Sequence, residues 1–246
     1  MSRHLPLHQS NGRRPGSDID TEGYELPIDI GSTHFLAFNK FASARPHLLL
    51  LTEDGYERQY TALGEHDMTA VHKVLSCLNG TGPRRYTAIY NCGIDGGCSR
   101  LHKHMQVFPV SDESRKGERF PIWPDAVTTA ESSSVPFHFF MHRFEKGFPP
   151  TSTLLHVYRQ LLGQAEKVWL EHEKGLERPE GHAIPHNVII DRNWMVVIPR
   201  RKAGWRGADA NAAGMLGMVW VKSEETMRLW TENGPAHVLS EVGIPC

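Results

Sequence analysis

Short apolar runs bounded by turn-forming residues dominate the first part of this 246-residue chain. HFLAF at 34–38, HLLLLT at 47–52 and YTAIYN at 86–91 are rich in aliphatic and aromatic residues, which is typical of β-strands. Residues 64–80 instead place apolar side chains at a helical spacing and close on a glycine that can end a helix. The pattern predicts the order strand, strand, helix, strand.

The second half of the chain adds further strands and two helices. Strands are expected at 101–110, where apolar and polar residues alternate, at 137–144, and on both sides of a turn at 191–193. The segments 151–173 and 207–230 are expected to be helical, the first because its apolar residues recur on one face.

Two polar stretches lack this patterning. Residues 1–30 carry Gly, Pro, Ser and charged residues with little periodicity, and we expect a loosely held, partly disordered arm that can still contribute a contact to a ligand or partner. Residues 111–135 are polar, contain two prolines and are expected to form an exposed excursion.

Composition narrows the class of protein. The chain is 39% hydrophobic, and its apolar runs are far shorter than the roughly 20 residues of a membrane span. The 27 Lys and Arg residues nearly balance the 28 Asp and Glu residues, so no overall field recruits nucleic acid or a membrane. Four cysteines and an N-terminus without an apolar signal core indicate a reducing compartment. We expect a cytoplasmic protein, with the nucleus as a second location.

A row of imidazoles is the most informative chemical feature. On a strand, His102, His104 and Gln106 would face one side of the sheet, and the residues at 103, 105 and 107 would face the other. The preceding loop, 93–99, contains three glycines that let backbone N–H groups turn toward an anion. An imidazole beside a phosphate site suits covalent nucleotidyl transfer.

Two other interpretations of these residues remain open. Alternating histidines on a strand can form an ordinary polar face. Cys92, Cys98, His102 and His104 are zinc-ligand types, but their C-x5-C-x3-H-x-H spacing matches no structural zinc pattern, so no metal site is predicted.

Several motifs, in order, carry a family resemblance. YNCGIDGGCSRLHKHMQVFP at 90–109 resembles the signature of the diadenosine tetraphosphate phosphorylases, also called ATP adenylyltransferases. In that branch of the histidine-triad superfamily, H-x-H-x-Q replaces the H-x-H-x-H of the hydrolases. FNKFASARPHLLLLT at 38–52 resembles an upstream segment of the family, and HNVIIDRNWMVVIPRR at 186–201 with NAAGMLGMVWVK at 211–222 resembles its C-terminal domain.

The resemblance implies a fold and a domain organisation. It implies a histidine-triad-like α+β fold, a mainly antiparallel sheet with packed helices. Residues 31–184 would form an N-terminal catalytic part and residues 185–246 a C-terminal part that completes the same sheet. Family members usually have a longer N-terminal region with an ordered element and a further lysine near the phosphates, and residues 1–23 have no obvious counterpart of it.

The resemblance also implies a reaction. His104 would attack the α-phosphorus of a dinucleoside tetraphosphate and form a histidyl-AMP intermediate, and phosphate would then release ADP. His102 would orient the ring of His104. Gln106 would bind phosphate oxygens without carrying a proton as a third histidine could. The other residues that the resemblance places around the substrate are Asn39, Lys40, Asn91, Gly97, Cys98, Ser99, Asn211, Met218 and Lys222.

Simpler roles exist for some of these residues. Lys40 could be a solvated surface lysine, and Met218 could be ordinary helix core. Arg200, Arg201 and Lys202 are a surface basic run by default. The expected partners are small-molecule nucleotides and phosphate. No tightly bound cofactor is expected, and Mg²⁺ on the substrate phosphates is the open alternative.

Two rival functions remain open, and the second belongs to another class of protein. The first is a nucleotide hydrolase or another nucleotidyltransferase of the superfamily, which dependence on phosphate would separate. The second is a non-catalytic nucleotide sensor, which would bind without turnover.

Overall fold

One antiparallel sheet organises the molecule. The computed structural model describes residues 14–80, 82, 84–110, 122–127, 134–173 and 178–246. Within these residues seven strands form a sheet in the order β1-β2-β4-β3-β6-β7-β5, and all neighbours are antiparallel. The strands are β1 His34–Phe38, β2 Leu48–Thr52, β3 Arg85–Cys92, β4 His104–Val110, β5 Phe140–Arg143, β6 His186–Ile190 and β7 Trp194–Pro199.

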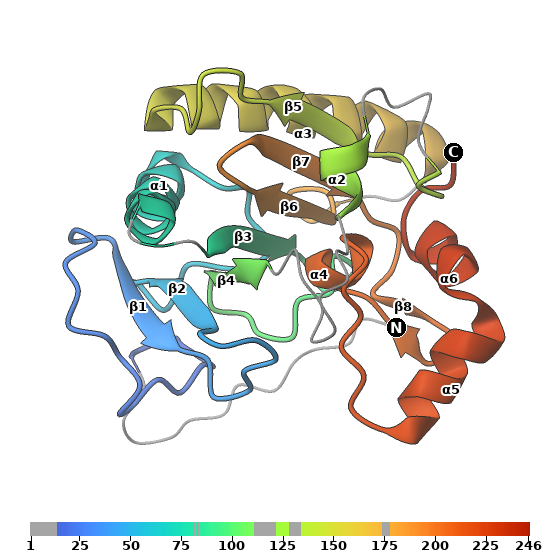
Figure 1. Cartoon of the computed structure of the whole chain (residues 1–246), viewed down its shortest axis with the longest axis horizontal. Helices are drawn as coiled ribbons and strands as arrows, with labels where there is room; N and C mark the ends of the chain where they lie inside the picture. The colour runs from blue at the N-terminus through green and yellow to red at the C-terminus, as the bar shows by residue number, and fades with distance from the viewer. Residues whose placement is uncertain (1–13, 81, 83, 111–121, 128–133, 174–177) are drawn as a thin grey trace.

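Helices cover both faces of this sheet. The long helices α1, Glu65–Gly80, and α3, Thr151–His172, contribute to one core together with Leu50, Tyr90 and Val107. The opposite face carries a second core with Phe108 and Trp194, and α5 and α6 gather at the side of the molecule away from α1 (Figure 1). The remaining elements are α2 Trp123–Ala126, α4 Ala212–Met215, α5 Glu224–Asn233, α6 Pro235–Val242 and the hairpin β8 Gly204–Trp205 with β9 Ala208–Asp209.

The predicted fold class is confirmed. The strands β6 and β7, from the C-terminal part of the chain, extend the sheet beside β3, so strands from both parts share one sheet. The division into a catalytic part at 31–184 and a C-terminal part at 185–246 stays a prediction. No helix in the described parts of the chain is long and apolar enough to cross a membrane.

The predicted helix at 207–230 is wrong over its middle. The segment instead contains β9, the single turn of α4 and, after residues without helical structure, α5. Gly217, with a positive φ of 97°, lies just beyond α4, and a left-handed residue ends a helix. Ser223 accepts a hydrogen bond from the Thr226 amide and starts α5. Periodicity alone missed both boundaries.

The predicted exposed excursion at 111–135 is wrong at 122–127. Ile122 and Val127 are buried in the second core, and the Asp125 carboxylate pairs with Arg85 and accepts from the indole N–H of Trp194. These contacts join α2 to the sheet. Residues 111–121 and 128–133 lie outside the described residues.

The expectation of a loose arm is wrong for residues 14–30. Ser17, Asp18, Thr21 and Ile30 are buried. Ile19 packs on a small core formed by β1 and β2 on the face opposite α1. The segment is held because its side chains find partners far along the chain, which local composition does not encode. Residues 1–13 lie outside the described residues.

We predict that Leu50→Ala will lower the free energy of unfolding by about 2–5 kcal/mol, because it leaves a cavity in a fully buried position of β2. Urea denaturation measures the effect. The control is Leu170→Ala, at a residue of α3 that is 52% exposed, with an expected change below about 0.5 kcal/mol. Equal effects in the two variants would contradict the assignment of the core.

Candidate active site

His104 and Gln106, the second and third residues of the histidine row, lie on one face of β4, as the alternation predicts. Met105 and Val107 belong to the core under α1 and α3, while Phe108 belongs to the core of the opposite face. His104 and Gln106 therefore share the face of Phe108. The strand expected at 101–110 begins at His104 in the structure, and His102 lies just before it. His102 forms an isolated β-bridge with Arg58.

The ring of His104 has a defined tautomer. Its Nδ1 lies 2.8 Å from the main-chain oxygen of His102. A carbonyl oxygen only accepts, so Nδ1 carries the hydrogen and Nε2 keeps a lone pair. Burial lowers the pKa of the ring, which favours the neutral form. His104 is thus a neutral imidazole whose Nε2 is available as a nucleophile.

His102 is held from both sides. Its Nε2 lies 2.9 Å from the Thr52 carbonyl oxygen, and its Nδ1 lies 2.8 Å from Ser17 Oγ. Burial lowers the pKa of the ring to about 4. In the neutral ring, Nε2–H donates to Thr52 and Nδ1 accepts from the Ser17 hydroxyl. His102 is therefore a fixed, neutral neighbour of His104.

Gln106 has a partner that the sequence analysis missed. The Nε2 of buried His47 lies 2.9 Å from Gln106 Oε1, and Asn39 Nδ2 lies 3.3 Å from the same nitrogen. Burial lowers the pKa of His47. The ring also contacts Phe108 and Trp220, with centroids 5.5 Å away in each case. A polar residue at the start of the apolar HLLLLT run is the signal that could have identified His47.

Asn91 and Asn211 lie beside the glycine loop, and their side-chain oxygens accept hydrogen bonds from main-chain amides of the protein. Asn91 Oδ1 accepts from the amide of Ala212, at 2.8 Å. Asn211 caps α4 by accepting from the amides of Ala213 and Gly214. Gly97 has a φ of +86°, and a Cβ there would lie 2.8 Å from the oxygen of Ala210 and 2.9 Å from Asn211 Cα. A glycine is required at this approach.

The amides of the glycine loop do not point toward an anion, contrary to the expectation from the sequence. The amides of Gly96, Gly97 and Cys98 donate to the carbonyl oxygens of Gly93, Ile94 and Gly93, so these donors are used inside the loop. Burial raises the pKa of the Cys98 thiol to about 12, while Ser99 is exposed. No set of three or more His, Cys, Asp or Glu residues able to hold a metal ion occurs among the described residues.

The remaining predicted residues, Lys40, Met218 and Lys222, have no contact with the histidine row among those that the structure gives for the described residues. Lys40 pairs with Asp20 at 2.7 Å, and both side chains are partly exposed. Met218 packs on the second core, as an ordinary core residue does. Lys222 is exposed, two residues after Trp220. The contacts of Lys40 are those of a surface ion pair, which contributes little to stability and separates readily.

The default interpretation of Arg200 as a surface residue is wrong. Its guanidinium is fully buried and donates to Asn187 Oδ1 at 2.6 Å and to the carbonyl oxygens of Ala210 and Val242. Asn187 Nδ2 in turn donates to Asn91 Oδ1 and to the Gly96 oxygen. Burial lowers the pKa of Arg200. This buried network joins β6, β7, the glycine loop and the segment before α4.

The other two residues of the basic run are paired. Arg201 lies 2.9 Å from Glu173 and Lys202 lies 3.0 Å from Glu241. Neither side chain is placed to act as an unpaired surface charge.

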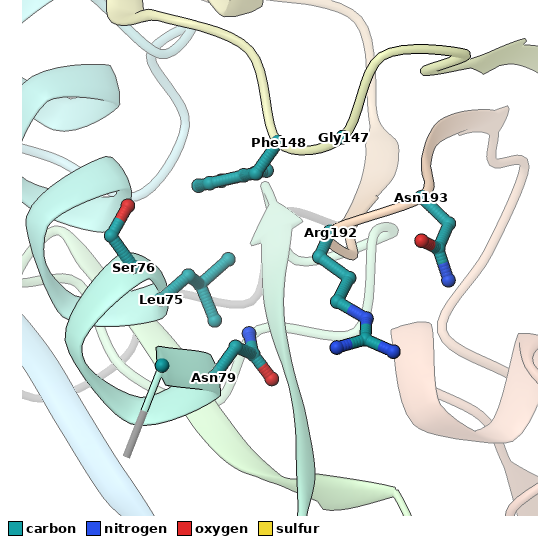
Figure 2. A pocket seen from close by; sticks show the side chains of 8 residues that line it. Leu75, Ser76, Asn79, Gly147, Phe148, Arg192 and Asn193 are labelled. Atoms are coloured by element: carbon teal, nitrogen blue, oxygen red, sulfur yellow. The ribbon is translucent and has the colours of Figure 1, made fainter.

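A separate cavity of about 420 Å³ lies away from the histidine row. Leu75, Ser76 and Asn79 of α1, Phe148 and the turn at 192–193 surround it, as Figure 2 shows. The turn adjoins the start of β3, where Asp191 pairs with Arg85, whereas Asn91 lies at the end of β3. None of the predicted site residues lines this cavity.

Comparison with known proteins gives consistent matches along the chain. Residues 24–127 match the family model of the Ap4A phosphorylase N-terminal domain, and residues 133–245 match that of the ATP adenylyltransferase C-terminal domain. Protein APA1 of Saccharomyces cerevisiae is 26% identical over 233 residues, covering 85% of this chain and 68% of that protein. Diadenosine 5',5'''-P1,P4-tetraphosphate phosphorylase 2 of the same yeast is 27% identical over 228 residues, covering 86% and 68%.

Solved structures share the fold. The crystal structure of yeast Ap4A phosphorylase Apa2 has a TM-score of 0.73 at 23% identity, covering 95% of this chain and 82% of that one. The structure of Apa2 with Ap4A has a TM-score of 0.71 at 24% identity, and the structure with AMP has one of 0.70 at 26% identity. Each of these covers 87% of this chain and 75% of the other.

An antiparallel α+β sheet that carries an H-x-H-x-Q row, with these matches, defines an enzyme of the nucleotidyltransferase class. Within that class, the chain belongs to the Ap4A phosphorylase family, also called the ATP adenylyltransferases.

We predict that Arg200→Lys will lower the free energy of unfolding by about 3 kcal/mol, because a lysine cannot satisfy the buried acceptors that Arg200 joins. Urea denaturation measures the loss. The control is Arg228→Lys, at an exposed i,i+4 ion pair of α5, where the change should stay below about 0.5 kcal/mol. A stable Arg200→Lys protein would mean that the network does not hold the C-terminal segment.

Proposed function

We propose that the protein catalyses the phosphorolysis of dinucleoside tetraphosphates, converting diadenosine tetraphosphate and phosphate to ATP and ADP through a histidyl-AMP intermediate on His104. The observation that carries the proposal is the hydrogen bond from His104 Nδ1–H to the His102 oxygen, which leaves a neutral Nε2 with a lone pair. The printed names of yeast diadenosine 5',5'''-P1,P4-tetraphosphate phosphorylase 2 and of the Ap4A phosphorylase Apa2 support phosphorolysis of this substrate.

Two displacements compose the proposed reaction. In the first, the Nε2 lone pair of His104 forms a bond to the α-phosphorus, and the bond from that phosphorus to the bridging oxygen breaks, so that ATP leaves with the electron pair. In the second, an oxygen of inorganic phosphate attacks the same phosphorus, the nitrogen–phosphorus bond breaks, and ADP leaves. His104 recovers its lone pair. Positioned donors supply most of the catalysis of such steps.

Gln106 suits phosphate as the second reactant. Its Oε1 faces His47, which is consistent with the ring N–H of His47 donating to it and with the amide NH₂ remaining available for a phosphate oxygen. A carboxamide is not basic near neutral pH, so it cannot remove a proton from water. The row thereby favours an acceptor that is already an anion.

The proposed substrate contacts follow the family resemblance. Lys40 would leave Asp20 and meet the phosphate chain, and Asn39 would contact substrate while it lies beside His47. Asn91, Gly97, Cys98, Ser99, Asn211, Met218 and Lys222 stay proposed substrate-binding residues. Mg²⁺ would come with the substrate phosphates.

The experiment that tests the function is incubation of the protein with diadenosine tetraphosphate, with and without phosphate, followed by identification of the nucleotides. We expect ATP and ADP only when phosphate is present. Formation of AMP without phosphate would instead indicate a hydrolase, and tight binding without turnover would indicate a sensor.

We predict that His104→Ala will lower kcat by about 10³-fold or more while nucleotide binding and folding survive, because only the nucleophile is removed. Steady-state assays and nucleotide titration measure the two effects. His156→Ala, at an exposed position of α3, is the control and should retain full activity. Near-normal turnover in His104→Ala would end the proposed mechanism.

We also predict that Gln106→His will shift the intermediate from phosphate toward water, because an imidazole can carry the proton that water must lose. The AMP to ADP ratio at fixed phosphate measures the shift. Gln160→His, on the exposed side of α3, introduces the same residue elsewhere and should leave the ratio unchanged. An unchanged ratio in active Gln106→His would remove Gln106 from the explanation of acceptor choice.

A further inference from the structure

The segment at 14–18 docks tightly against the loop after β2. A Cβ on Gly55 would overlap the main-chain oxygen of Pro15 and would lie 2.7 Å from the Ser17 nitrogen. Arg58 Nη1 donates to the main-chain oxygens of Gly16 and Gly55, at 3.2 and 2.6 Å. Backbone thus packs on backbone at Gly55, and no side chain fits between them.

The docked segment places two side chains on His102. Asp18 is 6% exposed, and its carboxylate accepts from two successive amides, Leu101 at 2.8 Å and His102 at 2.9 Å. Ser17 Oγ lies 2.8 Å from Nδ1 of the His102 ring. One segment therefore fixes both the main chain and the ring of the same histidine.

One further hydrogen bond connects His102 to His104, the proposed nucleophile. Asp18 holds the amide of His102, and the carbonyl of His102 holds Nδ1–H of His104. Attack through Nε2 with Nδ1–H retained turns the neutral ring of His104 into a cation. A buried carboxylate beside the two histidines stabilises that positive charge, because the interaction is weakly screened there.

The groups around His104 include some that raise its pKa and some that lower it. Burial lowers the pKa of His104 most, the carbonyl of His102 and the Asp18 carboxylate raise it, and the Arg100 guanidinium lowers it. On the opposite face of the strand, Lys103 pairs with Asp67 at 2.8 Å. Asp18 is thus the carboxylate that favours the cationic ring on the site face.

We propose that Ser17 and Asp18 are positioning residues of the active centre, which hold His102 so that His104 presents Nε2 and carries positive charge during adenylyl transfer. This inference rests on the proposed function. The family model of the N-terminal domain begins only at residue 24, so residues 14–18 lie outside the residues that this model matches.

The first test is Asp18→Asn, which removes the charge and can accept from only one of the two amides. Protein in excess is mixed with adenosine-labelled diadenosine tetraphosphate and quenched in alkali, in which a phosphoramidate survives. We expect the rate constant for protein-bound label to fall about 100-fold, while the nucleotide Kd changes less than about threefold. A lower stability alone does not change the rate constant of the folded fraction.

The control for this test is Asp29→Asn. Asp29 is exposed, lies in the same N-terminal region and also accepts from a backbone amide, that of Gly31 at 2.8 Å. We expect its rate constant to match the unmutated protein. Rate constants within about threefold in both variants would overturn the proposal.

A second variant, Gly55→Ala, displaces the segment without replacing any side chain of the site. We expect labelling to slow in the same direction as in Asp18→Asn. ¹⁵N NMR of the histidine rings gives a readout without substrate: the unmutated protein should show one tautomer each for His102 and His104, and Gly55→Ala should show mixed tautomers. Single tautomers and normal labelling in Gly55→Ala would overturn the proposal, even if Asp18→Asn fails to fold.

The failure of this inference can be told from failure of the proposed function. If the unmutated protein forms no labelled adduct, the proposed function is wrong, and the NMR comparison alone decides whether residues 14–18 position the histidines.

Discussion

The hydrogen bond between Nδ1–H of His104 and the main-chain oxygen of His102 is the interaction on which the centre depends. It decides which ring nitrogen keeps the lone pair, and it does so with backbone, whose position the sheet fixes. β4 lies between β2 and β3, so both of its edges are hydrogen-bonded and the strand cannot slide without losing two ladders. The central position of the strand therefore orients the ring of His104, the proposed nucleophile.

A second constraint is the buried polar network behind the glycine loop. Asn187 and Asn91 lie in the neighbouring strands β6 and β3, and Arg200 directly follows β7. Together they join segments that are more than a hundred residues apart in the chain. A buried guanidinium is costly unless its donors are satisfied, and here carbonyl and amide oxygens accept them. The arrangement ties the α4 segment to the sheet through Asn91 of β3, the strand that pairs with β4.

The sequence predicts what depends on neighbours in the chain and misses what depends on distant partners. The predicted side-chain alternation is local, since a strand has a period of two, and the structure has it within β4. The helix at 151–173 is equally local. Asp18 bonds to amides 83 and 84 residues away, so composition suggests only a loose arm. Arg200 looks like one of three surface cations, because nothing in RRK indicates that the first residue alone points into the core.

Burial of the imidazoles links this geometry to the choice of acceptor. Burial lowers the pKa of each of the three rings, His47, His102 and His104. At neutral pH all three rings are therefore neutral, and none readily takes a proton from solvent. In the proposed reaction ATP leaves as an anion without needing a proton from these rings. Water, in contrast, must lose a proton as it attacks, whereas inorganic phosphate arrives with its negative charge already formed. In the proposed reaction, a neutral, desolvated row with an amide at its third position offers no strong base to an attacking water molecule, and this favours phosphate as the acceptor.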